Sequence, residues 1–160
     1  SRRAAGLCAM KRWMLVSIGK MNLQHLKDRV VREGYGHLLF TGGPNLELND
    51  FRIEKTPGLF PKWRVCDYER GAITRTHLES TYEADACAFW YEGVSRMMLL
   101  LRRWLTNDLA ERAESTLNAA GIPSIRNDLP NDPAFKGLIY RTFVAGRDLA
   151  RGAIVVATLT

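Results

Sequence analysis

Apolar and polar positions alternate most regularly in the stretch from Phe51 to Leu105. Two runs, 51–56 and 62–69, alternate apolar with polar side chains, which is typical of strands with one buried face, and the outer end of the second run is polar on both faces. A third and more polar run follows from Ile73 to Tyr82, after the turn residues Arg70 and Gly71. We therefore predict three consecutive antiparallel strands, the third of them at the edge of a sheet.

After these strands, apolar residues recur at alternating spacings of three and four, which places them on one face of a helix. These residues are Ala84, Cys87, Tyr91, Val94, Met98, Leu101 and Leu105. Ser80 and Glu83 match a capping box, so the helix is predicted to begin near Thr81. We predict a single long amphipathic helix that ends at Leu105 and packs on the strands.

The flanking segments carry weaker patterns. Asn22 is predicted to cap a first helix that ends at Gly34, and Asp108 to cap a later one that ends at Gly121. A polar loop over 127–133 and a strand over 138–144 are predicted to follow. A final helix would begin at 146–149, but Gly152 and the β-branched residues after it leave the ending open.

Together these elements predict an α+β fold, in which a long amphipathic helix packs on a small antiparallel sheet and a second, small αββ unit follows. The predicted divisions are 1–20, 21–105 and 106–160, with the last packed on the same helix. With 46% apolar and 25% charged residues, the composition is that of an ordinary globular chain.

The net charge of +6 is concentrated at the beginning of the sequence. Residues 1–20 carry five basic residues and no acid, which leaves +1 for the other 140 residues. We therefore predict a disordered basic leader over 1–20 and no nucleic-acid or membrane partner for the folded part. The alternative is a short basic tail that touches a membrane surface or nucleic acid.

The sequence offers little for catalysis or metal binding. Cys8, Cys66 and Cys87 have no C-x-x-C spacing, a pattern that fits a reducing cytoplasm. A pair of Cys66 with His77 is geometrically possible across adjacent strands, and Asp67 and Glu69 share a strand face without a set of metal ligands. We predict no catalytic, cofactor-binding or metal-binding residues, no cofactor and no enzymatic activity. The alternative is a small enzyme that uses Cys66 or the two carboxylates.

Three blocks of the sequence carry a family resemblance. These are F-R-I-E-K from Phe51, W-R-V-C-D-Y-E-R-G from Trp63, and S-T-Y-E-A-D-A-C-A-F-W-Y from Ser80. Over about residues 22–92 the chain resembles small bacterial immunity proteins of polymorphic-toxin systems. A later part, about 109–149, with A-A-G-I-P and G-R-D-L-A-R, resembles small ferredoxin-like signal-transducing modules, although Gly152 departs from their continuous last helix.

The first resemblance implies a cytoplasmic, non-enzymatic protein that binds and blocks a cognate toxin. The polar end of the second strand, formed by Asp67, Tyr68, Glu69 and Arg70, is the predicted partner-binding site. The alternative for these four residues is a solvated turn. The alternative function is a regulatory or self-associating ferredoxin-like module that senses a small ligand. It would form a homodimer through the helix face that carries Met98 and Leu101.

Overall fold

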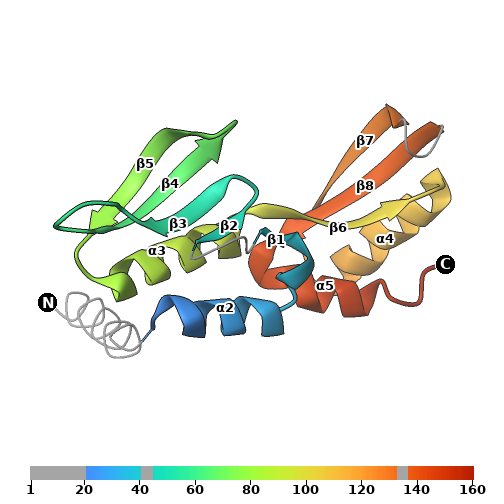
Figure 1. The fold of residues 1–160 in the computed structure, drawn as a ribbon. Coiled ribbons are helices and arrows are strands. Elements are labelled where there is room, and N and C mark those ends of the chain that lie inside the picture. Colours follow the sequence, from blue (N-terminus) through green and yellow to red (C-terminus); the bar gives the residue numbers. More distant parts are fainter. Residues whose placement is uncertain (1–20, 41–44, 133–136) are drawn as a thin grey trace, which may run out of the picture. The chain divides into compact units, whose positions relative to one another are not determined.

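The computed structural model describes residues 21–40, 45–132 and 137–160, and structural statements refer to these residues. The predicted basic leader over 1–20 lies outside them. The chain divides into two compact units, the first containing residues 36–92 with the preceding helix, and the second containing residues 33–35 and 93–160. Figure 1 shows that each unit combines helices with an antiparallel sheet, which confirms the α+β fold class.

The first unit contains a five-stranded meander in the order β1-β2-β3-β4-β5. Its elements are α2 (Leu23–Arg32), a 3₁₀ turn (Gly36–Leu38), β1 (Leu39–Phe40), β2 (Leu46–Leu48), β3 (Phe51–Lys55), β4 (Trp63–Glu69), β5 (Ala72–Ser80) and α3 (Glu83–Arg96), which continues into the second unit. The three predicted strands correspond to β3, β4 and β5, and β5 lies at the sheet edge as predicted.

One face of this sheet and the helix α3 form the core of the first unit. Leu46, Ile53 and Val65 lie side by side on adjacent strands and are fully buried. Trp90 of α3 is also buried, stacks on the ring of Phe51 at 6.2 Å and donates its indole N–H to the Phe51 carbonyl over 2.9 Å. The strand alternation visible in the sequence thus directs the apolar face toward α3.

The predicted N-terminal cap is confirmed for α2, whereas Glu83 at the beginning of α3 does not make the capping contact that was predicted. The side-chain oxygen of Asn22 accepts the backbone N–H of His25 at 2.9 Å. Glu83, which the capping box would direct to the N-terminus of its own helix, accepts instead the backbone N–H of Leu23 at 2.7 Å. Glu83 therefore links the beginnings of α2 and α3.

The prediction of one long helix to Leu105 is wrong beyond Arg96. The chain leaves α3 there and forms strand β6 (Met98–Trp104), in which Leu99 and Trp104 are buried. The helical spacing of apolar residues continued through Met98 and Leu101 by coincidence. A β-bulge between Leu100 and Arg102 inserts one residue into β6, so the strand shows no strict alternation that would have distinguished it from a helix. Pairing with β8 overrides the helix propensity of methionine and leucine.

This correction removes the helix face on which the homodimer prediction was based, since Met98 and Leu101 are strand residues. It also moves the division between the units to Gly93, before β6, whereas the sequence predicted a division after Leu105. The second unit therefore begins with the end of α3 and strand β6, and it is not a simple αββ unit.

The second unit has a three-stranded antiparallel sheet in the order β6-β8-β7 (Figure 1). Its remaining elements are α4 (Asn107–Ala119), β7 (Ser124–Asp132), β8 (Gly137–Ala145), a 3₁₀ turn (Gly146–Asp148) and α5 (Leu149–Val155). Thr106, not Asp108, caps α4 by accepting the N–H of Leu109. The segment predicted as a polar loop over 127–133 is largely strand, because β7 is an edge strand and such a strand accommodates Pro130.

The last helix continues through Gly152 to Val155, which resolves the ending that the sequence left open. A methyl group on Gly152 would lie 3.4 Å from both methyl carbons of Leu101 and 3.5 Å from Leu117. The glycine therefore lowers the helix propensity of α5 but allows close packing on β6 and α4.

Candidate functional site

The β4–β5 hairpin carries the four residues predicted to bind a partner. Because β4 ends at Glu69 and β5 begins at Ala72, Arg70 and Gly71 form a two-residue turn. Their φ angles of 50° and 85° are typical of the type I′ turn that joins twisted strands. The side chains of Glu69 and Arg70 are 62% and 91% exposed and lie 3.7 Å apart. The tip of the hairpin thus presents one acid and one base to solvent.

Asp67 lies two residues before the tip and faces the side of the sheet that α3 covers. Its carboxylate oxygen lies 2.8 Å from Nε2 of His77 on β5. The His77 ring meets Phe51 edge-on at 5.7 Å and lies 6.3 Å from the ring of Phe89 on α3. The half-exposed Asp67 carboxylate therefore lies against the edge of the His77 ring.

Tyr68 faces the opposite side of the sheet. The guanidinium of Arg52 lies 3.4 Å from the centre of the Tyr68 ring, and the Tyr68 backbone N–H donates to the Asp50 carbonyl over 2.7 Å. The structure thus brings Glu69 and Arg70 together at the tip, while Asp67 and Tyr68 stabilise its base from opposite faces. Strict alternation along a strand explains this separation.

A ladder of ion pairs crosses the sheet face on which Tyr68 lies. Arg52 contacts Glu47 at 2.5 Å and Glu54 at 3.5 Å, and Arg64 also contacts Glu54. All four side chains are mostly buried. The ladder pairs charges across three adjacent strands and fixes their register, as cross-strand pairs of opposite charge do.

Cys66 lies on this face and is completely buried. Burial raises the pKa of its thiol, Glu54 raises it further, and Arg64 and Arg52 oppose the change. Cys66 pairs with Thr76 across the strands, whereas His77 contacts Phe89 on the other side of the sheet. The structure therefore does not bring together Cys66 and His77, the pair that the sequence left geometrically possible.

The buried thiol of Cys87 gives a pH dependence of stability. Burial, with a contribution from Glu83, raises its pKa to about 12. Above about pH 9 the unfolded state loses this proton while the folded state keeps it, so the free energy of unfolding falls as pH rises. We expect the free energy of unfolding to fall less steeply with pH in Cys87→Ala than in the parent, by about 1.4 kcal/mol per pH unit, as measured by urea unfolding between pH 9 and 11. Equal slopes for parent and variant would contradict the assignment.

The loop between β3 and β4 exposes two adjacent apolar side chains that sequence reasoning did not single out. Leu59 is 93% exposed and Phe60 is 89% exposed. The sequence showed Pro57, Gly58 and Pro61 as loop residues, and the signal available was a pair of large apolar residues enclosed by prolines. This loop and the hairpin tip lie at opposite ends of β4.

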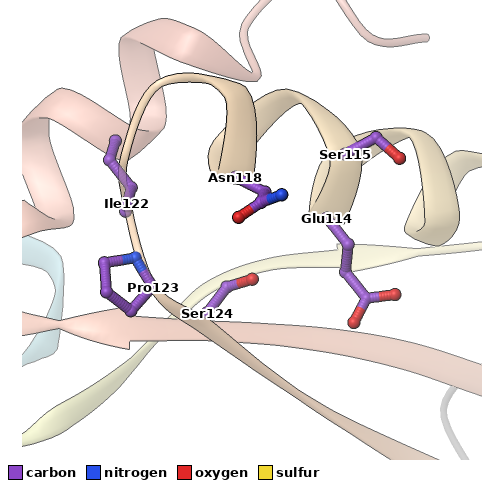
Figure 2. A pocket seen from close by; sticks show the side chains of 6 residues that line it. All are labelled: Glu114, Ser115, Asn118, Ile122, Pro123 and Ser124. Atoms are coloured by element: carbon purple, nitrogen blue, oxygen red, sulfur yellow. The ribbon is translucent and has the colours of Figure 1, made fainter.

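The second unit contains an open depression of about 420 Å³ beside the end of α4. Figure 2 shows Glu114, Asn118 and Ser124 directed toward the space between the helix and the beginning of β7. Glu114 lies 3.7 Å from Arg126, so its charge is already partnered. The depression offers polar groups but holds no buried titratable side chain.

The comparisons with known proteins give no identification: no protein-family model, no curated protein and no solved structure matches this chain. Within the described ranges, no three His, Cys, Asp or Glu side chains lie together in a way that could hold a metal ion. Across the same part of the chain, no helix is long and apolar enough to cross a membrane.

Proposed function

We propose that this chain is a non-enzymatic cytoplasmic protein that binds and inhibits a protein partner, in the manner of a bacterial immunity protein acting on its toxin. The observation that carries the proposal is the β4–β5 hairpin tip, where Glu69 and Arg70 are exposed on a two-residue turn between paired strands. A recognition site on such a rigid element loses little conformational entropy on binding.

The base of the hairpin supports this proposal. Asp67 contacts His77 on one face and Tyr68 contacts Arg52 on the other, so side chains pack against the base of the hairpin on both faces of the sheet. Opposite charges at the tip favour a partner with complementary charges and increase the rate of association. The thiol that the enzymatic alternative would use is inaccessible, since Cys66 is fully buried and burial raises the pKa of its thiol.

The test is an affinity measurement with a partner captured from the source cells by the full chain and then purified. We expect Glu69→Ala/Arg70→Ala to weaken binding by about 10-fold or more, and to reduce inhibition of the partner's activity equally. The matched control is Asp108→Ala/Arg112→Ala, which removes a comparable exposed ion pair on α4. The control should bind like the parent. Equal affinity for both double variants would contradict a role for the tip.

A further inference from the structure

The loop that joins β3 and β4 is held in one shape. The Thr56 backbone N–H donates to the Lys62 carbonyl over 2.7 Å, and the Lys62 N–H donates to the Thr56 hydroxyl over 2.8 Å. Between them, Pro57 and Pro61 each fix one backbone angle, and Gly58 adopts a φ of 116° that other residues rarely accept. These constraints pre-organise the five residues 57–61.

The side chains at the tip of this loop have no role in the core of the first unit. Leu59 and Phe60 are the two most exposed large apolar side chains in the described part of the chain. Single exposed apolar residues are common on protein surfaces, but two adjacent ones on a fixed loop form a compact apolar projection. A leucine and an aromatic side chain of this kind are suited to fill a pocket on another molecule.

The surroundings of the loop carry both signs of charge. Lys55 and Lys62 lie at its base, and the Lys55 ammonium lies 5.8 Å from the centre of the Trp63 ring. Two acids lie at the same end of the sheet. Glu79 is opposite Arg64 in the register, and Asp85 accepts the hydroxyl hydrogen bond of Ser80, which is opposite Trp63.

We propose that the 57–61 loop is an anchor that inserts Leu59 and Phe60 into an apolar pocket of a folded partner protein, with Lys55 and Lys62 facing acidic groups at the rim of that pocket. This inference rests on the proposed function and names a second contact for it. The mixed charge favours a protein over an anionic bilayer, because a bilayer would attract the lysines but repel Glu79 and Asp85.

The loop and the hairpin tip are separate contacts. They lie at the two ends of β4, whose seven residues span about 20 Å. A single globular partner is large enough to contact both ends, and the two contacts can be removed independently. This separation lets one experiment test the loop without depending on the tip.

The experiment titrates the purified partner with the full chain and with Leu59→Ser/Phe60→Ser. We expect the loop variant to bind about 30-fold more weakly or worse, because it removes both apolar anchors. The matched control is Leu105→Ser/Ile154→Ser, which makes the same change at two exposed apolar positions in the second unit and should stay within about 3-fold of the parent. Lys55→Gln/Lys62→Gln should slow association and reduce its dependence on salt.

Four results would overturn the proposal. Equal affinity of the parent and the loop variant, with binding lost in Glu69→Ala/Arg70→Ala, would retain the proposed function and reject the anchor. A similar loss in the two serine double variants would show that the effect is not specific to the loop. Binding to vesicles of phosphatidylcholine and phosphatidylglycerol that requires Leu59 and Phe60 would assign the loop to lipid. If the parent retains no protein, both the anchor and the proposed function fail.

Discussion

Gly146→Ala is expected to unfold or strongly destabilise the second unit, with a loss of at least about 3 kcal/mol in the free energy of unfolding. The added methyl group would lie 2.2 Å from the Val94 carbonyl oxygen and about 3 Å from the Tyr35 ring and hydroxyl. A backbone carbonyl cannot move away as the end of a flexible side chain can. The Gly146 N–H also donates to the Met97 carbonyl over 2.9 Å, which keeps the glycine in place.

Urea unfolding followed by circular dichroism gives the size of this loss, and amide exchange in β8 and α5 locates it. Gly152→Ala is the matched control, since its methyl group would meet only side-chain carbons at 3.4 Å or more. We expect this control to change stability by less than about 1 kcal/mol, because the better helix propensity of alanine offsets the tighter packing. Equal stability of the parent and Gly146→Ala would show that the turn after β8 is packed differently.

Trp90→Ala is expected to destabilise the first unit by about 3–5 kcal/mol. The substitution removes a fully buried indole that stacks on Phe51, and it leaves the Phe51 carbonyl without the N–H that it accepts at 2.9 Å. Chemical denaturation measures this effect, and amide exchange in β3 and β4 should rise in the variant.

Two further variants separate the contributions to this loss. Trp90→Phe keeps much of the apolar area but removes the indole N–H, so it should lose less than Trp90→Ala. Tyr82→Ala removes an exposed aromatic side chain near the beginning of the same helix and should change stability by less than about 0.5 kcal/mol. If Trp90→Ala and Tyr82→Ala were equally stable, Trp90 would not be the centre of this core.

Strands β3 and β4 of the first unit could be predicted because most of their apolar residues face one side of the sheet. Ile53 and Val65 alternate with Arg52 and Arg64, and the period of two is visible without any knowledge of the partner strand. The turn at Arg70 and Gly71 could also be predicted, since glycine there accepts the positive φ that a tight hairpin requires.

The end of α3 could not be predicted, because the same residues fit a helix and a bulged strand. The apolar run through Leu99 and Leu100 is decided by its pairing with Val144 and Phe143, which lie more than 40 residues later. A short apolar run carries no period of its own, so tertiary pairing determines its structure. The strand over 127–132 was missed for a related reason, since its polar residues pair with β8 at an edge.

Part of the candidate site could also be predicted from neighbouring residues in the sequence, and the rest depends on contacts between strands. The exposure of Glu69 and Arg70 follows from their place in the turn, which the sequence shows. The engagement of Asp67 by His77 depends on a bulge between Val65 and Cys66 that only the paired strands reveal. The exposure of Leu59 and Phe60 depends on how the two prolines and the Thr56–Lys62 hydrogen bonds direct the loop away from the core.

We propose that the first unit binds a protein partner through the two ends of β4. Hydrogen–deuterium exchange of the full chain, with and without the purified partner, tests this proposal. We predict that the partner slows exchange in the 57–62 loop and in the 68–73 turn, and leaves α4 and β7 unchanged. Slower exchange confined to the second unit, or no change at either end of β4, would contradict the claim.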